Sequence, residues 1–506
     1  MYIQGGMTDK MINLVNVSLM NKSNEIKDIS FFEESGFYDE IQVLQEEAAW
    51  RPVNLIVFFL NVLRGIITTV SLFVLLANFH ILIAILMFVA IIPQTFVYYR
   101  LQEEAFENMV TKSPLSRKLK YFFSLLLSHN HAYESRMFSY GKYFIGKYQE
   151  TFNKIHTDTM KIRKKRTILS TLWSILGTLT GSAAFAWLIF QTMDGNFTIG
   201  DVLAFTSVIV LSGQTMIALV QESSLLYDTL MYVEKFLNFL KLPIRISSGN
   251  KILSEGINSI EFRNVSFKYP GSKSFALNNI SFSIKKGEKT ALVGENGSGK
   301  STVMKLICRL YDVTEGDILI NGENIVDFNV DSLRKEIGIV FQDYSKYHLS
   351  LRDNVAISDI YSREKNSRFE YAVSRSGVDG IIAGYGLKDD HMLGKTFENG
   401  KELSEGEWQK VAISRAYFKE STALLFDEPS SALDAVSESH FFDRMEDISK
   451  DKLVLFVTHK LSGATISDKI IVLDNGKKVE EGTHEILLEM GGKYSELFTL
   501  QSERYK

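Results

Sequence analysis

Two long apolar stretches, separated by a polar segment, occupy the first half of the chain. Residues 54–99 read NLIVFFLNVLRGIITTVSLFVLLANFHILIAILMFVAIIPQTFVYY, which is long enough for two membrane spans of about 20 residues each. Residues 167–193 and 199–220 form a second apolar pair, with the polar turn DGNFT between them. Charge is almost absent from these stretches, so the pattern favours membrane spans over buried helices of a soluble core. We predict four spans, at about 58–78, 79–99, 167–191 and 199–220.

The polar segment between the two pairs, residues 100–166, is rich in lysine and arginine and ends in KIRKKR. Its length predicts long helices outside the bilayer. Because basic segments of this kind stay on the cytosolic side, we expect residues 100–166 and both termini in the cytosol. A nucleic-acid patch is the weaker interpretation, since an apolar span follows the basic run directly. Arg64 interrupts the first span, where its side chain could reach the headgroups or face a cavity.

From about residue 250 the pattern changes to short β-rich runs, glycine turns and charged helices, as in soluble α/β domains. The net charge of −4 gives no reason to expect a polyanion-binding protein. The single cysteine, Cys308, excludes an internal disulfide framework and lies in an apolar helical pattern that indicates core packing. We therefore predict a membrane domain over residues 1–240, a linker over 241–256 and a soluble domain over 257–506.

The soluble half contains a glycine-rich motif after a predicted buried strand. The segment GENGSGKS, residues 294–301, matches G-x-x-x-x-G-K-[ST] and precedes a helical pattern. Its glycines let backbone N–H groups converge on phosphate oxygens, and the helix N-terminus favours the same anion. The lysine would reach the β- and γ-phosphates of ATP, and the serine hydroxyl would ligate Mg²⁺. We expect nucleotide contacts from Gly294, Asn296, Gly297, Ser298, Gly299, Lys300, Ser301 and Thr302.

Three further apolar runs end in polar residues that suit nucleotide hydrolysis. ALLFDEPSSALD places Asp427 to hold Mg²⁺ and Glu428 to orient or deprotonate an attacking water. KLVLFVTHK ends near His459, whose imidazole could hydrogen-bond the γ-phosphate. IGIVFQD presents Gln342, an amide that could touch Mg²⁺ or the water. Parallel strands bring their carboxyl ends to one edge of a sheet, so we expect Glu428, His459 and Gln342 to act together in catalysis.

Tyr269 lies about 25 residues before the phosphate loop and could stack on an adenine face. With the segment LSEGE, residues 403–407, this ordered set of motifs resembles the nucleotide-binding domain of an ABC transporter. The resemblance covers about 250 residues, and LSEGE is similar to the signature L-S-G-G-Q of that family. It implies that Ser404 and Gly406 contact ATP held by the phosphate loop of a second copy. It also implies a nucleotide-proximal role for Asp434 in the loop by which the two copies communicate.

The signature of this chain departs from the consensus at two positions. Glu405 stands where the family has glycine, and Glu407 stands where it has glutamine. A carboxylate aimed at a triphosphate would repel it, so we expect the Glu405 side chain to point away. The departures leave the rate of ATP hydrolysis open.

The membrane half resembles the exporter type of the family, closest to exporters of lantibiotics and similar bacteriocin peptides. The resemblance implies a helical transmembrane domain followed by an α/β ATPase domain with a mixed sheet core, a β-subdomain and an α-helical subdomain. It also implies cytosolic coupling segments near residues 28–42 and 129–141. Six spans are usual in such exporters, and the printed sequence opens just before the first coupling segment, so two spans are expected to be missing.

The implied function is ATP-driven export across the cytoplasmic membrane, with ATP and Mg²⁺ as cofactors and the ATPase domain in the cytosol. The expected partners are a second copy or a related half-transporter, a peptide or other amphipathic cargo, the bilayer, and possible peptide-modifying enzymes, with no nucleic acid. Three alternatives stay open: a lipid or drug exporter, a transport-defective remnant that still binds ATP, and a non-transport ABC ATPase. The last of these would carry charged coiled coils or a second ATPase domain in place of apolar spans.

Overall fold

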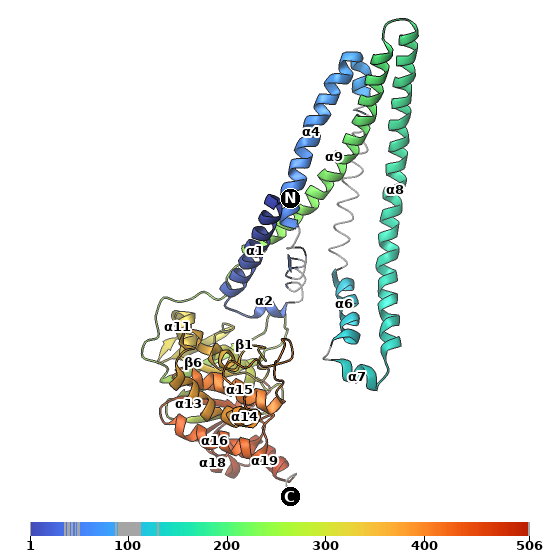
Figure 1. Cartoon of the computed structure of the whole chain (residues 1–506). Coiled ribbons are helices and arrows are strands. Elements are labelled where there is room, and N and C mark those ends of the chain that lie inside the picture. Colours follow the sequence, from blue (N-terminus) through green and yellow to red (C-terminus); the bar gives the residue numbers. More distant parts are fainter. Residues whose placement is uncertain are drawn as a thin grey trace. The chain divides into compact units, whose positions relative to one another are not determined.

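The computed structural model describes residues 2–34, 37, 41, 44–45, 47, 51–86, 89, 113–128 and 131–503. The described chain divides into two compact units (Figure 1). The first consists of Met1–Asn24 and Glu34–Pro243, and the second consists of Glu25–Glu33 and Ile244–Lys506.

The described part of the first unit is built of helices. Three of its helices are long and apolar enough to cross a membrane: α4 (Arg51–Phe79), α8 (Gly141–Met193) and α9 (Ile199–Leu240). They contain the predicted spans 58–78, 167–191 and 199–220, whereas the predicted span 79–99 lies largely outside the described residues. The other helices are α1 (Tyr2–Glu25), α6 (Ser113–Leu127) and α7 (Ala132–Met137).

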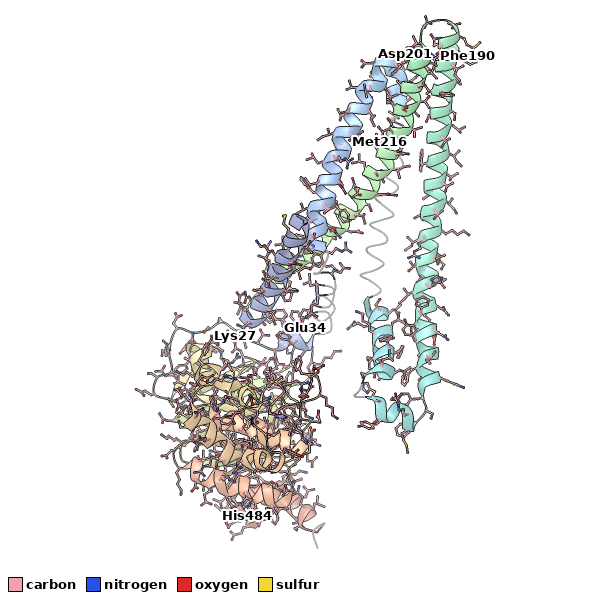
Figure 2. All side chains as sticks on the ribbon, viewed as in Figure 1. Lys27, Glu34, Phe190, Asp201, Met216 and His484 are labelled. Atoms are coloured by element: carbon pink, nitrogen blue, oxygen red, sulfur yellow. The ribbon has the colours of Figure 1, made fainter. Side chains whose placement is uncertain are left out.

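Both apolar pairs are interrupted in the structure, the first near the predicted boundary between spans 58–78 and 79–99 and the second at the predicted DGNFT turn. α4 ends at Phe79, and His80 separates it from the helical residues 81–86. The DGNFT turn joins α8 to α9, where the Thr198 hydroxyl and the Asp201 carboxylate form a capping box. Figure 2 shows Asp201 near this turn. Polar caps of this kind satisfy the free backbone N–H groups at a helix start, which fixes the break between the two apolar runs.

Apolar side chains join α4, α8 and α9 near these turns. A buried cluster there consists of Leu76, Ala84, Ala184, Leu188 and Phe205. The Phe79 and Phe205 rings meet edge to face with centroids 5.2 Å apart. Farther along α4, a Cβ on Gly65 would lie 2.9 Å from Leu219 Cδ1, so the glycine permits close approach of α4 and α9.

A six-stranded sheet forms the centre of the second unit, in the order β10-β9-β3-β8-β7-β6. Its strands are β3 (Lys289–Val293), β6 (Ile337–Val340), β7 (Ala423–Asp427), β8 (Leu453–Val457), β9 (Lys469–Asp474) and β10 (Lys477–Gly482). All neighbours are parallel except β10, which pairs antiparallel with β9. β3, β7 and β8 are buried throughout, as expected for parallel strands covered on both faces.

A second sheet of four antiparallel strands has the order β2-β1-β4-β5. Its strands are β1 (Ser259–Phe267), β2 (Leu277–Lys285), β4 (Glu315–Ile320) and β5 (Glu323–Asn324). Side chains from β1 and β2 share one buried apolar cluster with helix α10 (Lys300–Ile307) and strand β3. Cys308 lies in this cluster, where burial raises the pKa of its thiol to about 12, so its predicted role in core packing is confirmed.

A helical subdomain lies between β6 and β7 in the sequence. Helices α12 (Leu351–Ala356), α13 (Asn366–Ser376) and α14 (Val378–Tyr385) all contact α15 (Glu405–Phe418). Trp408 of α15 is 1% exposed and belongs to the larger apolar cluster of the unit. The described unit also contains helices α11 (Val330–Lys335), α16 (Ala435–Ser449), α17 (Leu461–Ala464), α18 (His484–Glu489) and α19 (Lys493–Glu503).

Residues 25–33, which include α2 (Ser30–Glu33), pack with the second unit. Lys27 pairs with Asp331 at 2.9 Å, and the Tyr311 hydroxyl donates to the Glu33 carboxylate. The Arg245 guanidinium lies 3.8 Å from the ring centroid of Phe31. The start of the predicted first coupling segment, including the buried Phe31, therefore belongs to the α/β unit. Several residues of this segment beyond Glu34 lie outside the described part of the chain.

Candidate nucleotide site

The phosphate loop connects β3 to α10, as its motif predicts. Gly294, Gly297 and Gly299 have φ of 154°, 82° and 104°, a backbone region that residues other than glycine rarely adopt. A Cβ on Gly294 would lie 2.2 Å from the Leu473 carbonyl oxygen, and one on Gly299 would lie 2.5 Å from Leu277 Cδ2. These glycines therefore let the loop curl tightly at the start of α10, where backbone N–H groups can receive an anion.

Lys300 is 5% exposed and donates to the carbonyl oxygens of Gly294 at 2.9 Å and Glu295 at 2.7 Å. Its ammonium group thus lies inside the curl of the loop. Burial lowers the pKa of Lys300, while the carboxylates of Glu428 and Asp427 act in the opposite direction. A buried cation beside two acids is suited to a triphosphate with its metal ion.

Glu428, Gln342 and His459 are brought together at the carboxyl ends of β7, β6 and β8. Gln342 Nε2 donates to Glu428 Oε2 at 3.1 Å, and His459 Nε2 lies 2.6 Å from Glu428 Oε1. Glu428 has φ of 53°, an uncommon conformation that directs the carboxylate from the strand end. The sheet topology thus assembles the three residues that the sequence proposed for catalysis.

Asp427 ends β7 and is 3% exposed. Burial raises the pKa of its carboxyl, against a smaller lowering by a hydrogen bond with Ser301. Its Oδ1 atom is buried and has no hydrogen-bond partner within the described residues. An unsatisfied carboxylate oxygen beside a serine hydroxyl fits a hard cation such as Mg²⁺, which also takes water and phosphate oxygens as ligands.

Tyr269 lies beside the start of α10. Its hydroxyl is 3.0 Å from Thr302 Oγ1, and its ring meets those of Phe267 and Tyr311 edge to face, with centroids 4.9 Å and 5.4 Å apart. Lys305 Nζ lies 5.2 Å from the Tyr269 ring centroid. The half-buried ring is thus held from two sides next to the phosphate loop, where it can offer a face to a base.

Replacing Tyr269 by leucine is expected to raise the KM for ATP about fivefold to tenfold with little change in kcat, because a base stack contributes about 1–3 kcal/mol to binding. Tyr269→Phe keeps the ring and loses only the Thr302 contact, so its KM should stay near that of the unchanged protein. Steady-state ATPase assays over a range of ATP concentrations measure both values. Equal KM values for the leucine and phenylalanine variants would contradict a stacking role.

Ser404 is the N-cap of α15 and forms a capping box with Glu407. Its hydroxyl donates to Glu407 Oε2 at 2.9 Å, and the Glu405 carboxylate pairs with Lys346 at 2.5 Å. A Cβ on Gly406 would lie 2.7 Å from the Ala432 carbonyl oxygen, so this position requires a residue without a side chain. Among the described residues no hydrogen bond joins Ser404 to the phosphate loop of its own chain.

Gly406→Ala is expected to lower ATP turnover about tenfold, because the added Cβ displaces the start of α15 from backbone atoms that cannot give way. Gly380→Ala is the matched control, since a Cβ on that helical glycine meets nothing within 4 Å. Phosphate release and equilibrium ATP binding separate the effects: turnover should fall while binding by the phosphate loop is retained. Equal turnover in the two variants would show that the close approach at Gly406 is unimportant.

Asp434 takes a capping role in this structure. Its carboxylate accepts hydrogen bonds from the Val436 and Ser437 N–H groups and from the Ser437 hydroxyl at the start of α16. The Ser437 hydrogen bonds lower the pKa of Asp434 to about 2. The nearby loop is tied to α15 by Gln409, which sequence reasoning did not select.

Gln409 is 2% exposed and lies on α15. Its Nε2 donates to the Glu428 carbonyl oxygen at 3.1 Å, and its Oε1 accepts from Ala432 N at 3.0 Å. The Gln409 amide therefore joins α15, which begins within the LSEGE segment, to the segment after Glu428. The available sequence signal was a polar residue within the run WQKVAISRAYF, which by itself does not identify the partner.

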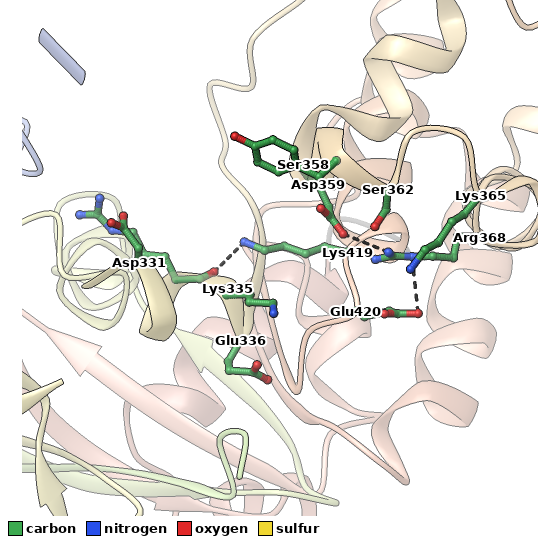
Figure 3. A pocket seen from close by; sticks show the side chains of 12 residues that line it. Asp331, Lys335, Glu336, Ser358, Asp359, Ser362, Lys365, Arg368, Lys419 and Glu420 are labelled. Carbon is green, nitrogen blue, oxygen red and sulfur yellow. Dashed lines mark hydrogen bonds and ion pairs between the residues drawn. The ribbon is translucent and has the colours of Figure 1, made fainter. Parts of the chain in front are cut away.

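A pocket of about 750 Å³ elsewhere in the α/β unit contains none of the nucleotide-site residues (Figure 3). Arg368 pairs there with Asp359 at 2.9 Å and with Glu420 at 3.6 Å. Lys419 Nζ donates to the Arg334 carbonyl oxygen at 2.6 Å. The pocket is lined by both acidic and basic side chains.

Comparison with known proteins supports the interpretation of this site as a nucleotide site. Residues 277–431 match the sequence family described as ABC transporter. The subtilin transport ATP-binding protein of Bacillus subtilis is 31% identical over 97% of this chain and 80% of its own length. The nisin transport ATP-binding protein of Lactococcus lactis subsp. lactis is 28% identical over 100% of this chain and 84% of its own length. An ATP-dependent lipid A-core flippase of Haemophilus influenzae is 31% identical over 72% of this chain and 62% of its own length.

Solved structures show the same fold. A bacterial Atm1-family ABC exporter with ATP bound superimposes with a TM-score of 0.83 at 23% identity, covering 99% of this chain and 86% of that protein. The predicted fold class, a helical membrane domain followed by an α/β ABC ATPase domain, is thereby confirmed. With its phosphate loop, its three strand-end residues and its apolar helices, the chain belongs to the ABC transporter family, as an exporter that couples ATP hydrolysis to transport.

Proposed function

We propose that the chain is a half-transporter that pairs with a second copy, or with a related chain, and exports a lantibiotic-like or bacteriocin-like peptide across the cytoplasmic membrane. The cargo assignment rests on one observation. The relatives named for subtilin and nisin transport match over 97% and 100% of this chain, while the lipid A-core flippase matches over 72%.

The ATP cycle assigns a role to each residue at the edge of the six-stranded sheet. Lys300 and the N–H groups of the phosphate loop hold the triphosphate, and Tyr269 stacks on the base. Glu428 accepts the proton of the attacking water, with His459 and Gln342 fixing the carboxylate by their contacts at 2.6 Å and 3.1 Å. Mg²⁺, held by Asp427, Ser301 and Gln342, would neutralise charge on the phosphates. Asn296, Gly297, Ser298 and Thr302 complete the nucleotide-binding set.

Two copies complete the site. In the pair, Ser404 and Gly406 at the start of α15 approach the ATP held by the other copy, where the positive end of the helix dipole favours an anion. Asp434 shapes the neighbouring loop by capping α16. ATP closes the pair and hydrolysis reopens it, so the membrane helices alternate between two states that bind cargo with different affinity.

In the proposed membrane topology, residues 1–240 form the membrane domain with four spans, residues 241–256 form the linker, and residues 257–506 form the cytosolic ATPase domain. Residues 28–42 and 129–141 act as coupling segments. In the second of these, Tyr133 and Met137 of α7 and its C-cap residue Phe138 are 77%, 80% and 68% exposed. Apolar side chains exposed to this degree call for a covering surface, as expected of a segment that transmits motion to another domain.

Lipid export is the second candidate function, because lipid A-core flippases are among the relatives. Both cargoes are amphipathic and would use a cavity lined by apolar side chains. They differ in what stimulates the ATPase, so cargo-dependent stimulation is the property to measure.

The test uses the full chain reconstituted in vesicles with the ATPase domain outside. A lanthionine-bridged cationic peptide should raise ATP turnover and be taken up only when ATP is present, whereas a linear peptide of the same composition and a fluorescent lipid should not. Glu428→Gln vesicles control for passive leakage. Stimulation by the lipid alone would replace the peptide proposal with the lipid one, and ATP turnover unaffected by either cargo would contradict both.

A further inference from the structure

The non-consensus acid Glu405 is joined to the segment that follows Gln342. The Lys346 ammonium lies 2.5 Å from Glu405 Oε2, and the Tyr344 hydroxyl donates to the Glu405 carbonyl oxygen at 2.9 Å. Burial and the nearby Glu405 carboxylate raise the pKa of Tyr344 to about 12. A glycine at position 405 would offer no carboxylate to Lys346.

The same segment is anchored farther along α15 by Arg415, which is 8% exposed. Arg415 Nη1 donates to the Ser345 carbonyl oxygen at 2.7 Å, and its guanidinium lies 4.8 Å from the Tyr347 ring centroid. Residues 344–347 are thus fastened to α15 near its start and in its last turn. Gln342, two residues before this segment, contacts the Glu428 carboxylate.

Charge at the start of α15 also requires an explanation. Glu405 and Glu407 are both in the first turn of α15. The Glu407 carboxylate is held by the Ser404 N–H group at 2.7 Å and by the Ser404 hydroxyl at 2.9 Å. Within the described part of the chain, no backbone N–H or hydroxyl group donates to the Glu405 carboxylate; Lys346 is its partner, and its side chain is 65% exposed. An unpaired carboxylate at this position would repel an approaching triphosphate. The positive charge of the adjacent lysine offsets this repulsion.

We propose that Lys346 is a positioning residue for ATP-driven pairing: it neutralises Glu405 and ties the Gln342 segment to the signature end of α15. Gln342 contacts Glu428 in the ATP site of its own chain. Lys346 thereby connects this site to the start of α15, where Ser404 faces the ATP of the second copy. This inference rests on the proposed pairing of two copies, and it deepens that proposal by assigning a function to a residue outside the family motifs.

The experiment measures ATP turnover of the full chain in nanodiscs against ATP concentration. Lys346→Met should raise the apparent KM for ATP about threefold to tenfold, the size expected for one uncompensated charge near a multiply charged anion. Glu405→Gln should leave KM unchanged or lower it. The double variant should return to the Glu405→Gln value, because no charge then needs compensation. The increase caused by Lys346→Met should shrink at high salt.

Lys450→Met is the matched control, since it removes a lysine from another exposed ion pair of the same domain, with Asp447 at 3.6 Å. A Lys346→Met variant that behaves like this control would overturn the inference. A double variant as impaired as Lys346→Met would also overturn it, because the lysine would then act independently of Glu405.

Failure of the pairing itself is recognised separately, in the Glu428→Gln background. If that variant forms no ATP-dependent pair even with Lys346 and Glu405 intact, the proposed function fails together with this inference. If the pair forms and Lys346→Met does not weaken it, the inference alone is overturned.

Discussion

Glu428→Gln is expected to lower ATP turnover about a thousandfold while leaving ATP binding intact, because a positioned general base contributes about 10²–10⁴-fold to rate. The amide keeps the size of the carboxylate but cannot take a proton from water. His459 and Gln342, which contact the two carboxylate oxygens at 2.6 Å and 3.1 Å, retain a polar partner. The site should therefore keep its geometry and lose the ability to deprotonate the attacking water.

Phosphate release under saturating ATP measures the turnover, and cross-linking or size analysis of the ATP-loaded protein detects the trapped pair. Glu438→Gln is the matched control, since Glu438 is an acid of the same domain that is 16% exposed and pairs with Lys460 at 2.8 Å. That variant should hydrolyse ATP normally. Turnover of Glu428→Gln above about a tenth of the normal rate would assign the base to another residue.

The parts of the site that could be predicted from sequence are those whose chemistry depends on neighbours in the chain. Gly294, Gly299 and Lys300 lie within one loop, so their spacing alone indicates the curl and the phosphate contact. The strand-end residues Glu428 and His459 could be predicted because parallel strands share an edge, a rule that needs no detailed coordinates. The turn at 194–198 was equally local, since two apolar runs and a polar cap define it.

Contacts that depend on packing between distant segments were not accessible from the sequence. The packing of α15 near the end of β7 places Gln409 against the Glu428 carbonyl oxygen. The hydrogen-bond partner of a single buried amide cannot be deduced from the sequence around it. Likewise, the expectation that Glu405 turns from the triphosphate followed from repulsion alone. Its pairing with Lys346 required two segments 59 residues apart to meet.

The membrane half was predictable in a different way. Apolar length alone located the apolar parts of α4, α8 and α9 and the turn between α8 and α9, because a lipid environment demands long runs without charge. The same rule says little about which faces of the helices meet. Small residues such as Gly65, which lets Leu219 approach closely, set that packing, and nothing in the local pattern distinguishes them from other glycines.

Lys300→Met is expected to weaken ATP binding about a hundredfold or more, because charge-assisted hydrogen bonds to phosphate are among the strongest in a buried site. The effect has two sources. The ammonium group that faces the triphosphate is lost, and the carbonyl oxygens of Gly294 and Glu295 lose the donor that holds the loop curled. Methionine fills much of the same volume, so the apolar packing of α10 should be maintained.

Equilibrium binding of a fluorescent ATP analogue to the full chain measures the affinity, with Lys305→Met as the matched control. Lys305 lies one turn farther along α10, beside the Tyr269 ring and 3.5 Å from Glu33, so its removal should change affinity only slightly. The pH dependence gives an independent check. Because burial lowers the pKa of Lys300, the unliganded site loses its positive charge at a lower pH than an exposed lysine would, and affinity should fall earlier on the alkaline side. Affinity of Lys300→Met within about threefold of the unchanged protein would mean that the loop binds phosphate through its N–H groups alone.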